Sequence, residues 1–286
     1  METWTAERVE ALVSSDPDAS QLWVALDGSR QVGCVRVHPV PRPGAHVMRE
    51  LAVDADRPEP IVDRLLDVAL DHLCELKATV VRASTPPVRL YTDGYRRRGF
   101  VPVRRALTLA WDLSGQRWAA PSSAPVVVHD AGRYAPELLA ALYVEGMRPY
   151  WDWYIEERGG TEALKRRATG HFTSLRSKDE RWLVAELAAS AVGLAGVSAL
   201  GADAADLEGV YVLPAHRGEG VGSALMQATL AMVRERTTRL VVTETTSFLD
   251  SDIPSIRLYV RSGAQPQAEY VHLQAEGTSI WRRASR

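Results

Sequence analysis

The segment Val210–Gly222, VYVLPAHRGEGVG, carries three alternate glycines where an expected strand passes into an expected helix. Because glycine has no Cβ, the backbone at Gly218, Gly220 and Gly222 can turn sharply and let a ligand lie against its N–H groups. The unpaired N–H groups of a helix's first turn, with the positive end of the helix dipole, form an anion site. Arg217 is expected to add a charge-assisted donor. The segment therefore predicts a phosphate-binding turn.

The elements around this turn occur twice in the chain. Two strands joined by a short turn are expected in Gln21–Val37 and again in Arg181–Val197. Each hairpin is followed by a short strand, an amphipathic helix and another strand. A Leu-Tyr pair then closes each copy, Leu90-Tyr91 in the front half and Leu258-Tyr259 in the back half. The matching hairpin pairs lie 160 residues apart: Val24-Ala25 with Val184-Ala185, and Val32-Gly33 with Val192-Gly193.

This repeat predicts an α+β fold with two tandem domains, each a mixed α/β sheet flanked by helices. The stretch from Ser114 to Pro125 is rich in Ser, Pro and Ala, which is typical of a linker. We therefore expect one domain at residues 1–118, a linker at 119–125 and a second domain at 126–286.

Composition and charge exclude several classes of protein. Lys and Arg number 34 against 36 Asp and Glu, a net charge of -2, so the basic excess of a nucleic-acid-binding protein is absent. No apolar run reaches the length of a membrane helix, and we expect a cytoplasmic protein that binds no membrane. The two cysteines form no metal-binding pattern, and His216 and His272 stand alone, so no metal site is expected.

The glycine turn differs from the common nucleotide-binding motifs, because its spacing is neither G-x-G-x-x-G nor that of a P-loop. A V-x-V strand followed by Arg-Gly-x-Gly-x-Gly resembles the acyl-CoA pyrophosphate loop of the GNAT (GCN5-related N-acetyltransferase) superfamily. The segment after the next strand also resembles that family, because Leu258, Tyr259 and Gly263 match its pattern in register. Three positions depart from the pattern: Asp252 stands for Asn, Ser255 for Ala and Ala264 for Phe.

The resemblance covers most of residues 126–286 and implies a site for acetyl-CoA as co-substrate. Carried over position by position, the expected contacts with acetyl-CoA are Val210, Tyr211, Val212, Arg217, Gly218, Gly220, Val221, Gly222, Ser223, Asp252 and Ser255. In the family, strands splay beside the thioester, and the strand end at Val210–Leu213 is expected to supply a backbone N–H there.

Transfer of an acetyl group to an amine needs a base for the ammonium and an acid for the departing thiolate. The resemblance implies Tyr259 as the general acid; the alternative is a core aromatic residue. Strand alternation puts Asp206, Glu208, Val210 and Val212 on one face, and Glu208 is the first candidate base, with Asp206 second. The alternative for both carboxylates is solvated charge at a strand start.

The acceptor is expected to bind near the aromatic segment Tyr150, Trp151, Asp152 and Trp153, because aromatic faces and a carboxylate suit an amine. A hydrophobic anchor between the domains is the alternative. Glu244 is a further candidate for holding the ammonium. The back half has no Cys, which favours direct attack on the thioester over an acyl-enzyme.

The front copy has lost the features of the turn. Pro58, Pro60 and Val62 replace the three glycines, so this copy is expected to be degenerate and without cofactor. The resemblance thus implies an acyl-CoA N-acyltransferase, and we expect it to acetylate a primary amine on a small molecule, as a monomer or homodimer. Two alternatives stay open: an acetyltransferase similar to the tandem mycothiol synthases, and a non-catalytic acyl-CoA-binding or regulatory module.

Overall fold

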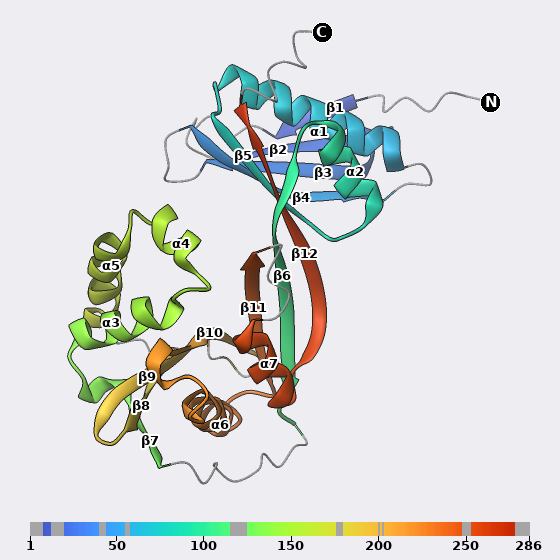
Figure 1. Cartoon of the computed structure of the whole chain (residues 1–286). Helices are drawn as coiled ribbons and strands as arrows, with labels where there is room; N and C mark the ends of the chain where they lie inside the picture. The colour runs from blue at the N-terminus through green and yellow to red at the C-terminus, as the bar shows by residue number, and fades with distance from the viewer. Residues whose placement is uncertain are drawn as a thin grey trace. The chain divides into compact units, whose positions relative to one another are not determined.

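The computed structural model describes residues 8–12, 20–39, 44–54, 58–114, 125–175, 180–199, 201, 203–247 and 253–277. The described residues form two compact units that are not continuous in sequence (Figure 1). The first unit takes the residues up to Ala106, Ser247, and those from Glu269 onward; the second takes Leu107–Thr246 and the residues from Asp250 to Ala268. This division differs from the expected one, because the end of the chain joins the first unit. The predicted linker, 119–125, lies outside the described residues except for Pro125.

The first unit is a sheet covered by two helices. Its strands lie in the order β1-β2-β3-β4-β5-β12, and all neighbours are antiparallel except β4 and β5. The elements are β1 (Arg8–Leu12), β2 (Gln21–Asp27), β3 (Arg30–Pro39), β4 (Ala45–Val53), α1 (Pro58–Glu75), β5 (Val80–Thr85), α2 (Arg89–Arg97), the start of β6 (Val101–Asp112) and the end of β12 (Gln265–Glu276). Helix α1 buries Ile61, Leu65 and Leu66 completely against the sheet.

The second unit has the strand order β6-β11-β10-β9-β8-β7, in which β10 and β11 are parallel and β7 to β10 are antiparallel. The strands are β7 (Val126–Asp130), β8 (Arg181–Leu187), β9 (Ser190–Ser198), β10 (Ala205–Val212) and β11 (Arg239–Ser247). The helices are α3 (Pro136–Met147), α4 (Asp152–Glu157), α5 (Thr161–Thr173), α6 (Val221–Val233) and α7 (Pro254–Arg261), with short 3-10 turns η1 (Ala131–Arg133) and η2 (Pro214–His216).

Helices cover both faces of the second sheet. On β9, Gly193 faces α6, where an added Cβ would come within 3.0 Å of Leu225 and Val221. The next residue, Leu194, packs in the cluster formed by α3 and α5. Because neighbouring strand residues point to opposite faces, α6 lies on one face and α3 and α5 lie on the other. The predicted mixed sheet flanked by helices is confirmed. Within the described chain, no helix combines the length and apolar character needed to cross a membrane.

The two units repeat the same hydrogen bonds, which confirms the internal repeat. Asp54 N–H donates to the Val32 carbonyl at 2.9 Å, and Leu213 N–H donates to the Val192 carbonyl at 3.0 Å. Each bond joins the residue that follows the strand before the turn to the second strand of the hairpin.

One predicted correspondence between the copies is wrong by four residues. At the end of α7, Ala264 N–H donates to the Tyr259 carbonyl at 3.0 Å, and at the end of α2 Phe100 N–H donates to the Tyr95 carbonyl at 3.2 Å. Gly99 and Gly263, each four residues after the tyrosine, share positive φ values of 86° and 97°. Tyr259 therefore corresponds to Tyr95, and the Leu90-Tyr91 pair matched the sequence pattern without occupying the equivalent position.

Candidate active site

The site begins where β10 and β11 separate. The two strands pair only at Ala205 with Leu240 and at Asp206 with Val241. Beyond Asp206, β10 stays paired with β9 through a β-bulge at Leu207/Gly209, and Gly209 has a φ of 137°. A separated parallel pair leaves one edge of β10 without a strand neighbour and opens a wedge between the strands. The predicted splaying of the strands is present.

The turn after β10 is held open by two left-handed glycines. Gly218 and Gly220 both have a φ of 85°, and α6 begins directly afterwards at Val221. The N-terminus of α6 has no side-chain cap, so the N–H groups of its first turn point out of the helix without an intrahelical acceptor. A Cβ on Gly218 would meet no atom within 4 Å, which shows that this side of the turn is open. The turn therefore has the form that an anion site requires.

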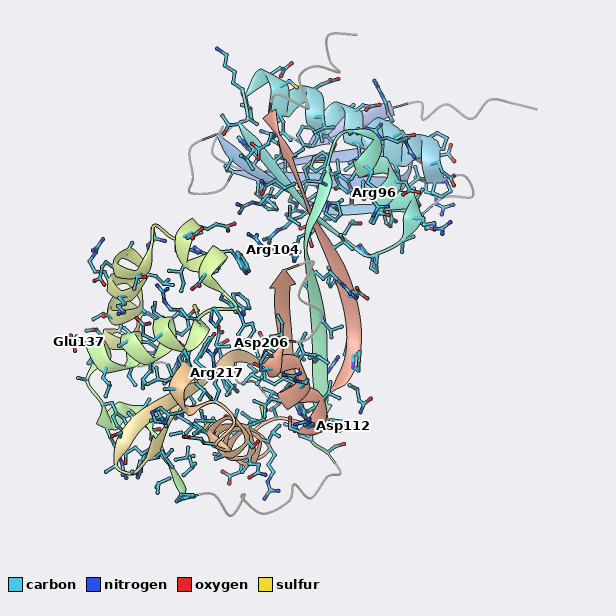
Figure 2. The ribbon with its side chains drawn as sticks, viewed as in Figure 1. Arg96, Arg104, Asp112, Glu137, Asp206 and Arg217 are labelled. Atoms are coloured by element: carbon cyan, nitrogen blue, oxygen red, sulfur yellow. The ribbon has the colours of Figure 1, made fainter. Side chains whose placement is uncertain are left out.

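The Arg217 side chain joins the turn to the end of α3 and is not directed to an open anion site. Its Nε donates to the Val212 carbonyl at 3.1 Å, and its Nη2 donates to the carbonyls of Gly146, at 2.9 Å, and Arg148. The guanidinium also lies 5.3 Å from the centre of the Tyr150 ring. Burial lowers the pKa of Arg217. Figure 2 places Arg217 on the segment between β10 and α6. The side chain expected to serve as a phosphate donor is thus engaged with main-chain carbonyls.

A cleft of about 350 Å³ runs from the turn into the wedge between the strands. It is lined by nine of the residues predicted to contact acetyl-CoA: Val210, Tyr211, Val212, Arg217, Gly218, Gly220, Gly222, Ser223 and Ser255. The Val221 side chain is instead buried in the core, and Asp252 lies outside the described residues. The Ser255 hydroxyl is buried with no hydrogen-bond partner in the described part of the chain, so the cleft contains a polar group that a ligand can satisfy.

Tyr259 is a buried residue of α7 beside this cleft. Its side chain is 1% exposed, and its ring packs edge-on against Trp111 with 5.6 Å between centroids. The same residue lines the cleft. Tyr259 is therefore at once a core aromatic residue and a wall of the site, which is compatible with its predicted role as general acid.

The bulge changes which way the candidate bases point. Leu207 and Val210 both pack in the cluster around α6, although residues three apart on a regular strand face opposite sides. The extra residue therefore returns Val210 and Val212 to the α6 side and leaves Asp206 and Glu208 on the other. The prediction that these four residues share one face is wrong. Gly209 was the available signal, because glycine within a strand often marks a bulge.

Glu208 lies where two cavities meet. It lines the cleft described above and also a second cavity of about 350 Å³ on the α3 and α5 side. Its carboxylate accepts a hydrogen bond from the Ser198 hydroxyl. Asp206 lines neither cavity. The structure thus brings Glu208, and not Asp206, to the site.

Only part of the aromatic segment predicted to bind the acceptor lines the cleft. Tyr150 and Trp151 line the cleft, whereas Trp153 stacks on Trp151 with 5.4 Å between centroids. Asp152 forms an ion pair with Arg148 at 3.5 Å. Asp152 and Trp153 line neither of the two cavities. The Glu244 side chain lies outside the described residues.

The second cavity is one that the sequence patterns did not predict. Its aromatic wall comes from α3, α5 and β8, as Tyr143, Phe172 and Trp182. No motif marks these residues, because each is an isolated aromatic side chain on a different element. Burial raises the pKa of Tyr143, and the Glu208 carboxylate adds to that increase.

In the described ranges, no three His, Cys, Asp or Glu side chains come together in a way that would hold a metal ion.

Comparison with known proteins agrees with this geometry. A family model described as "Acetyltransferase (GNAT) family" matches residues 145–264. A GCN5-related N-acetyltransferase from Sphaerobacter thermophilus has a TM-score of 0.62 at 18% identity, over 91% of this chain and 81% of that chain. A tandem GNAT protein from the clavulanic acid biosynthesis pathway has a TM-score of 0.56 at 18% identity, over 92% and 85% of the two chains. A GCN5-related N-acetyltransferase from Kribbella flavida has a TM-score of 0.55 at 18% identity, over 85% and 87%.

No curated protein sequence matches the chain significantly. The family match covers the turn, the cleft and α7, and the solved structures share the fold of the chain. Residues 145–264 are therefore a GNAT-family domain, and the chain as a whole has the fold of a tandem GNAT protein.

Proposed function

We propose that the protein is an N-acyltransferase that uses acetyl-CoA to acetylate a primary amine on a small molecule, with the second unit as the catalytic one. The observation that carries this proposal is the continuity of the cleft. Its lining takes in the uncapped start of α6, the separated edge of β10, and the side chains of Tyr259 and Glu208. An anion site and titratable groups in one cleft match the phosphates and the thioester of an acyl-CoA.

The residues present suit acetyl-CoA on two independent counts. The open side of Gly218 lets phosphate oxygens approach the N–H groups of the turn. The unpaired Ser255 hydroxyl offers a hydrogen bond to a polar group in the cleft.

The chemistry divides between three parts of the chain. Glu208 takes a proton from the acceptor's ammonium, directly or through water, and the neutral nitrogen attacks the thioester carbonyl carbon. A carbon–nitrogen bond forms, and main-chain N–H groups on the free edge of β10 stabilise the oxyanion. The carbon–sulfur bond then breaks, Tyr259 gives its proton to the departing thiolate, and the second proton lost by the attacking nitrogen returns to the tyrosinate, directly or through water. A tyrosine, with an ordinary pKa near 10, is well matched to an alkanethiolate.

Calorimetric titration with acetyl-CoA tests the cofactor site. We expect one equivalent to bind, and we expect Gly220→Glu to weaken binding by at least about 100-fold, because a carboxylate would stand beside the phosphates. The matched control is Pro60→Glu, at the equivalent position of the first unit, which should bind as the unaltered chain does. Two equivalents, no binding, or equal loss in both variants would overturn the assignment of the cofactor to the second unit. Release of free thiol in the presence of amines then tests the transfer reaction.

A further inference from the structure

The second cavity has a rigid aromatic wall. Phe172 and Trp182 are 6% and 4% exposed, with ring centroids 5.1 Å apart, and Tyr143 meets both rings edge-on at 6.3 and 6.1 Å. Interlocked rings of this kind hold a fixed shape. A volume of about 350 Å³ is at the lower end for small-molecule sites, so the cavity suits a compact ligand with an apolar or aromatic body.

The two carboxylates that line the cavity differ in their hydrogen-bond partners. Glu180 already accepts hydrogen bonds from Trp182 Nε1 and from His171 Nε2, both at 2.7 Å. The Glu208 carboxylate accepts a hydrogen bond only from the Ser198 hydroxyl among the described residues, and Glu208 is exposed at the junction with the acetyl-CoA cleft. A ligand's ammonium is therefore drawn to Glu208, at the point where an acetyl group is to be transferred.

Two cations at the rim of the cavity lack carboxylate partners. Arg158 and Arg167 are exposed and line the cavity, and neither forms an ion pair with any acidic residue in the described part of the chain. Arg158 lies over the Tyr154 ring, 4.8 Å from its centre, which holds the guanidinium in place. Guanidinium groups bind carboxylates and phosphates in bidentate fashion.

From these groups we infer the acceptor class: a small amine with an apolar or aromatic body that also carries an anionic group, bound in the second cavity. The ammonium lies at Glu208, the body lies against Phe172 and Trp182, and the anionic group pairs with Arg158 and Arg167. This inference rests on the proposed function, since it names the acceptor of that reaction. It moves the acceptor away from Trp153 and Asp152, where the sequence placed it.

Matched amines that differ by one carboxylate test the inference with the full chain and acetyl-CoA. The probes are benzylamine against para-(aminomethyl)benzoate, and phenethylamine against para-(2-aminoethyl)benzoate, with thiol release as the readout. We expect the carboxylate-bearing member of each pair to have a kcat/KM about tenfold higher, the effect of one charge-assisted hydrogen-bonded pair.

The double variant Arg158→Gln/Arg167→Gln gives a selective prediction. It should raise KM for para-(aminomethyl)benzoate about tenfold and leave KM for benzylamine and the Kd of acetyl-CoA unchanged. Arg166→Gln is the control. It removes an exposed arginine that precedes Arg167 on α5 but does not line the cavity, and it should change neither of the two KM values nor the Kd of acetyl-CoA.

The outcomes distinguish failure of the inferred acceptor class from failure of the proposed function. A chain that binds acetyl-CoA but shows no preference for the anionic amines, or turns over no amine in the panel, overturns the acceptor class. An equal rise in KM for both members of a pair in the double variant also overturns it, because the arginines would then act only on the fold. A chain that binds no acetyl-CoA overturns the proposed function itself.

Discussion

The same junction of strand and helix is closed in the first unit and open in the second. Helix α1 begins at Pro58, whereas α6 begins at Val221, the counterpart of Ile61 at the spacing of the repeat. In the first unit, Pro58–Pro60 therefore form the first helical turn, and proline at such positions removes N–H donors. In the second unit, Gly218 and Gly220 keep the equivalent residues out of the helix. A shift of three residues in where the helix starts distinguishes the turn of the first unit from the turn that we propose as an anion site.

The packing behind the two turns shows a reciprocal exchange. In the second unit the small residue is Gly222 on α6 and the large one is Leu258 on α7, whose Cδ2 lies 3.3 Å from where a Cβ on Gly222 would stand. In the first unit the large residue is Val62 on α1, and the small one is Gly94 on α2, where a Cβ would come to 3.1 Å from Val62 Cγ1. Both units keep the contact between their two helices. Only the second unit has no side chain at this position near the start of its helix. Ligand access and helix packing have thus changed together.

The tyrosines that correspond in the two copies give the largest expected difference. We expect Tyr259→Phe to lower kcat by about 100- to 1000-fold while the Kd of acetyl-CoA changes little, because proton donation to the thiolate is lost. Tyr95→Phe, in the first unit, should leave kcat unchanged and not destabilise the fold, because the Tyr95 hydroxyl is buried without a hydrogen-bond partner in the described residues. Steady-state kinetics and thermal unfolding of both variants make the comparison. Undiminished kcat in Tyr259→Phe would remove this residue from the mechanism.

The reciprocal packing predicts a coupling between two substitutions in the second unit. Gly222→Val alone should destabilise by about 1–3 kcal/mol through crowding. Leu258→Gly alone should destabilise by a similar amount, because it removes packing and places glycine in a helix. The double variant recreates the pairing of the first unit, and we expect it to be more stable than the sum of the single effects by about 1 kcal/mol or more. Denaturant unfolding measures the cycle, with Val62→Gly/Gly94→Leu as its mirror image. Strict additivity would show that the exchange is coincidental.

The smallest expected effect concerns charge at the start of the two helices. Asp63 of α1 forms ion pairs with Arg98 at 2.7 Å and Arg97 at 2.9 Å, whereas Ser223 and Ser262 stand at the positions of Asp63 and Arg98 in the second unit. Partial burial alone would raise the pKa of Asp63, but the hydrogen bonds from the two arginines outweigh it and hold that pKa below its ordinary value of 3.8.

A lowered pKa means that the folded state favours the ionised carboxylate. Its stabilising effect is present above the pKa of the unfolded chain and is lost as the pH falls through the folded value. Asp63→Asn should therefore lower the free energy of unfolding at pH 7 by less than about 1 kcal/mol, with the difference disappearing in acid below about pH 4. Asp71→Asn, an equal charge change on the same helix, is the control for unfolding followed against pH. A deficit that persists in acid would assign the effect to something other than the ion pairs.

Local rules predicted those parts of the molecule that depend on neighbours in sequence. The glycine turn, the two hairpins and the start of α6 follow from glycine geometry, strand alternation and helix termini, and the structure contains all three. The bulge at Gly209 reversed the direction of Glu208 relative to Val210, because one extra residue inverts an alternation that the sequence treats as continuous.

Other parts depend on residues far apart in the chain. Arg217 donates to carbonyls at Gly146 and Arg148, about seventy residues earlier, and no pattern within the turn reveals that contact. The second cavity likewise combines side chains from α3, α5, β8 and β10, each unremarkable in its own segment. The sequence also did not predict that β12 completes the sheet of the first unit. The residues of a strand do not specify which other strand it pairs with.

The end of β12 pairs with β5, Val271 opposite Thr85 and Glu276 opposite Val80. During synthesis, the ribosome must add roughly 190 residues after β5 before that partner exists, which takes on the order of ten to forty seconds at ordinary elongation rates. Until then the outer edge of β5 presents unpaired main-chain groups of the kind that promote aggregation. The unit that is translated first is therefore completed last.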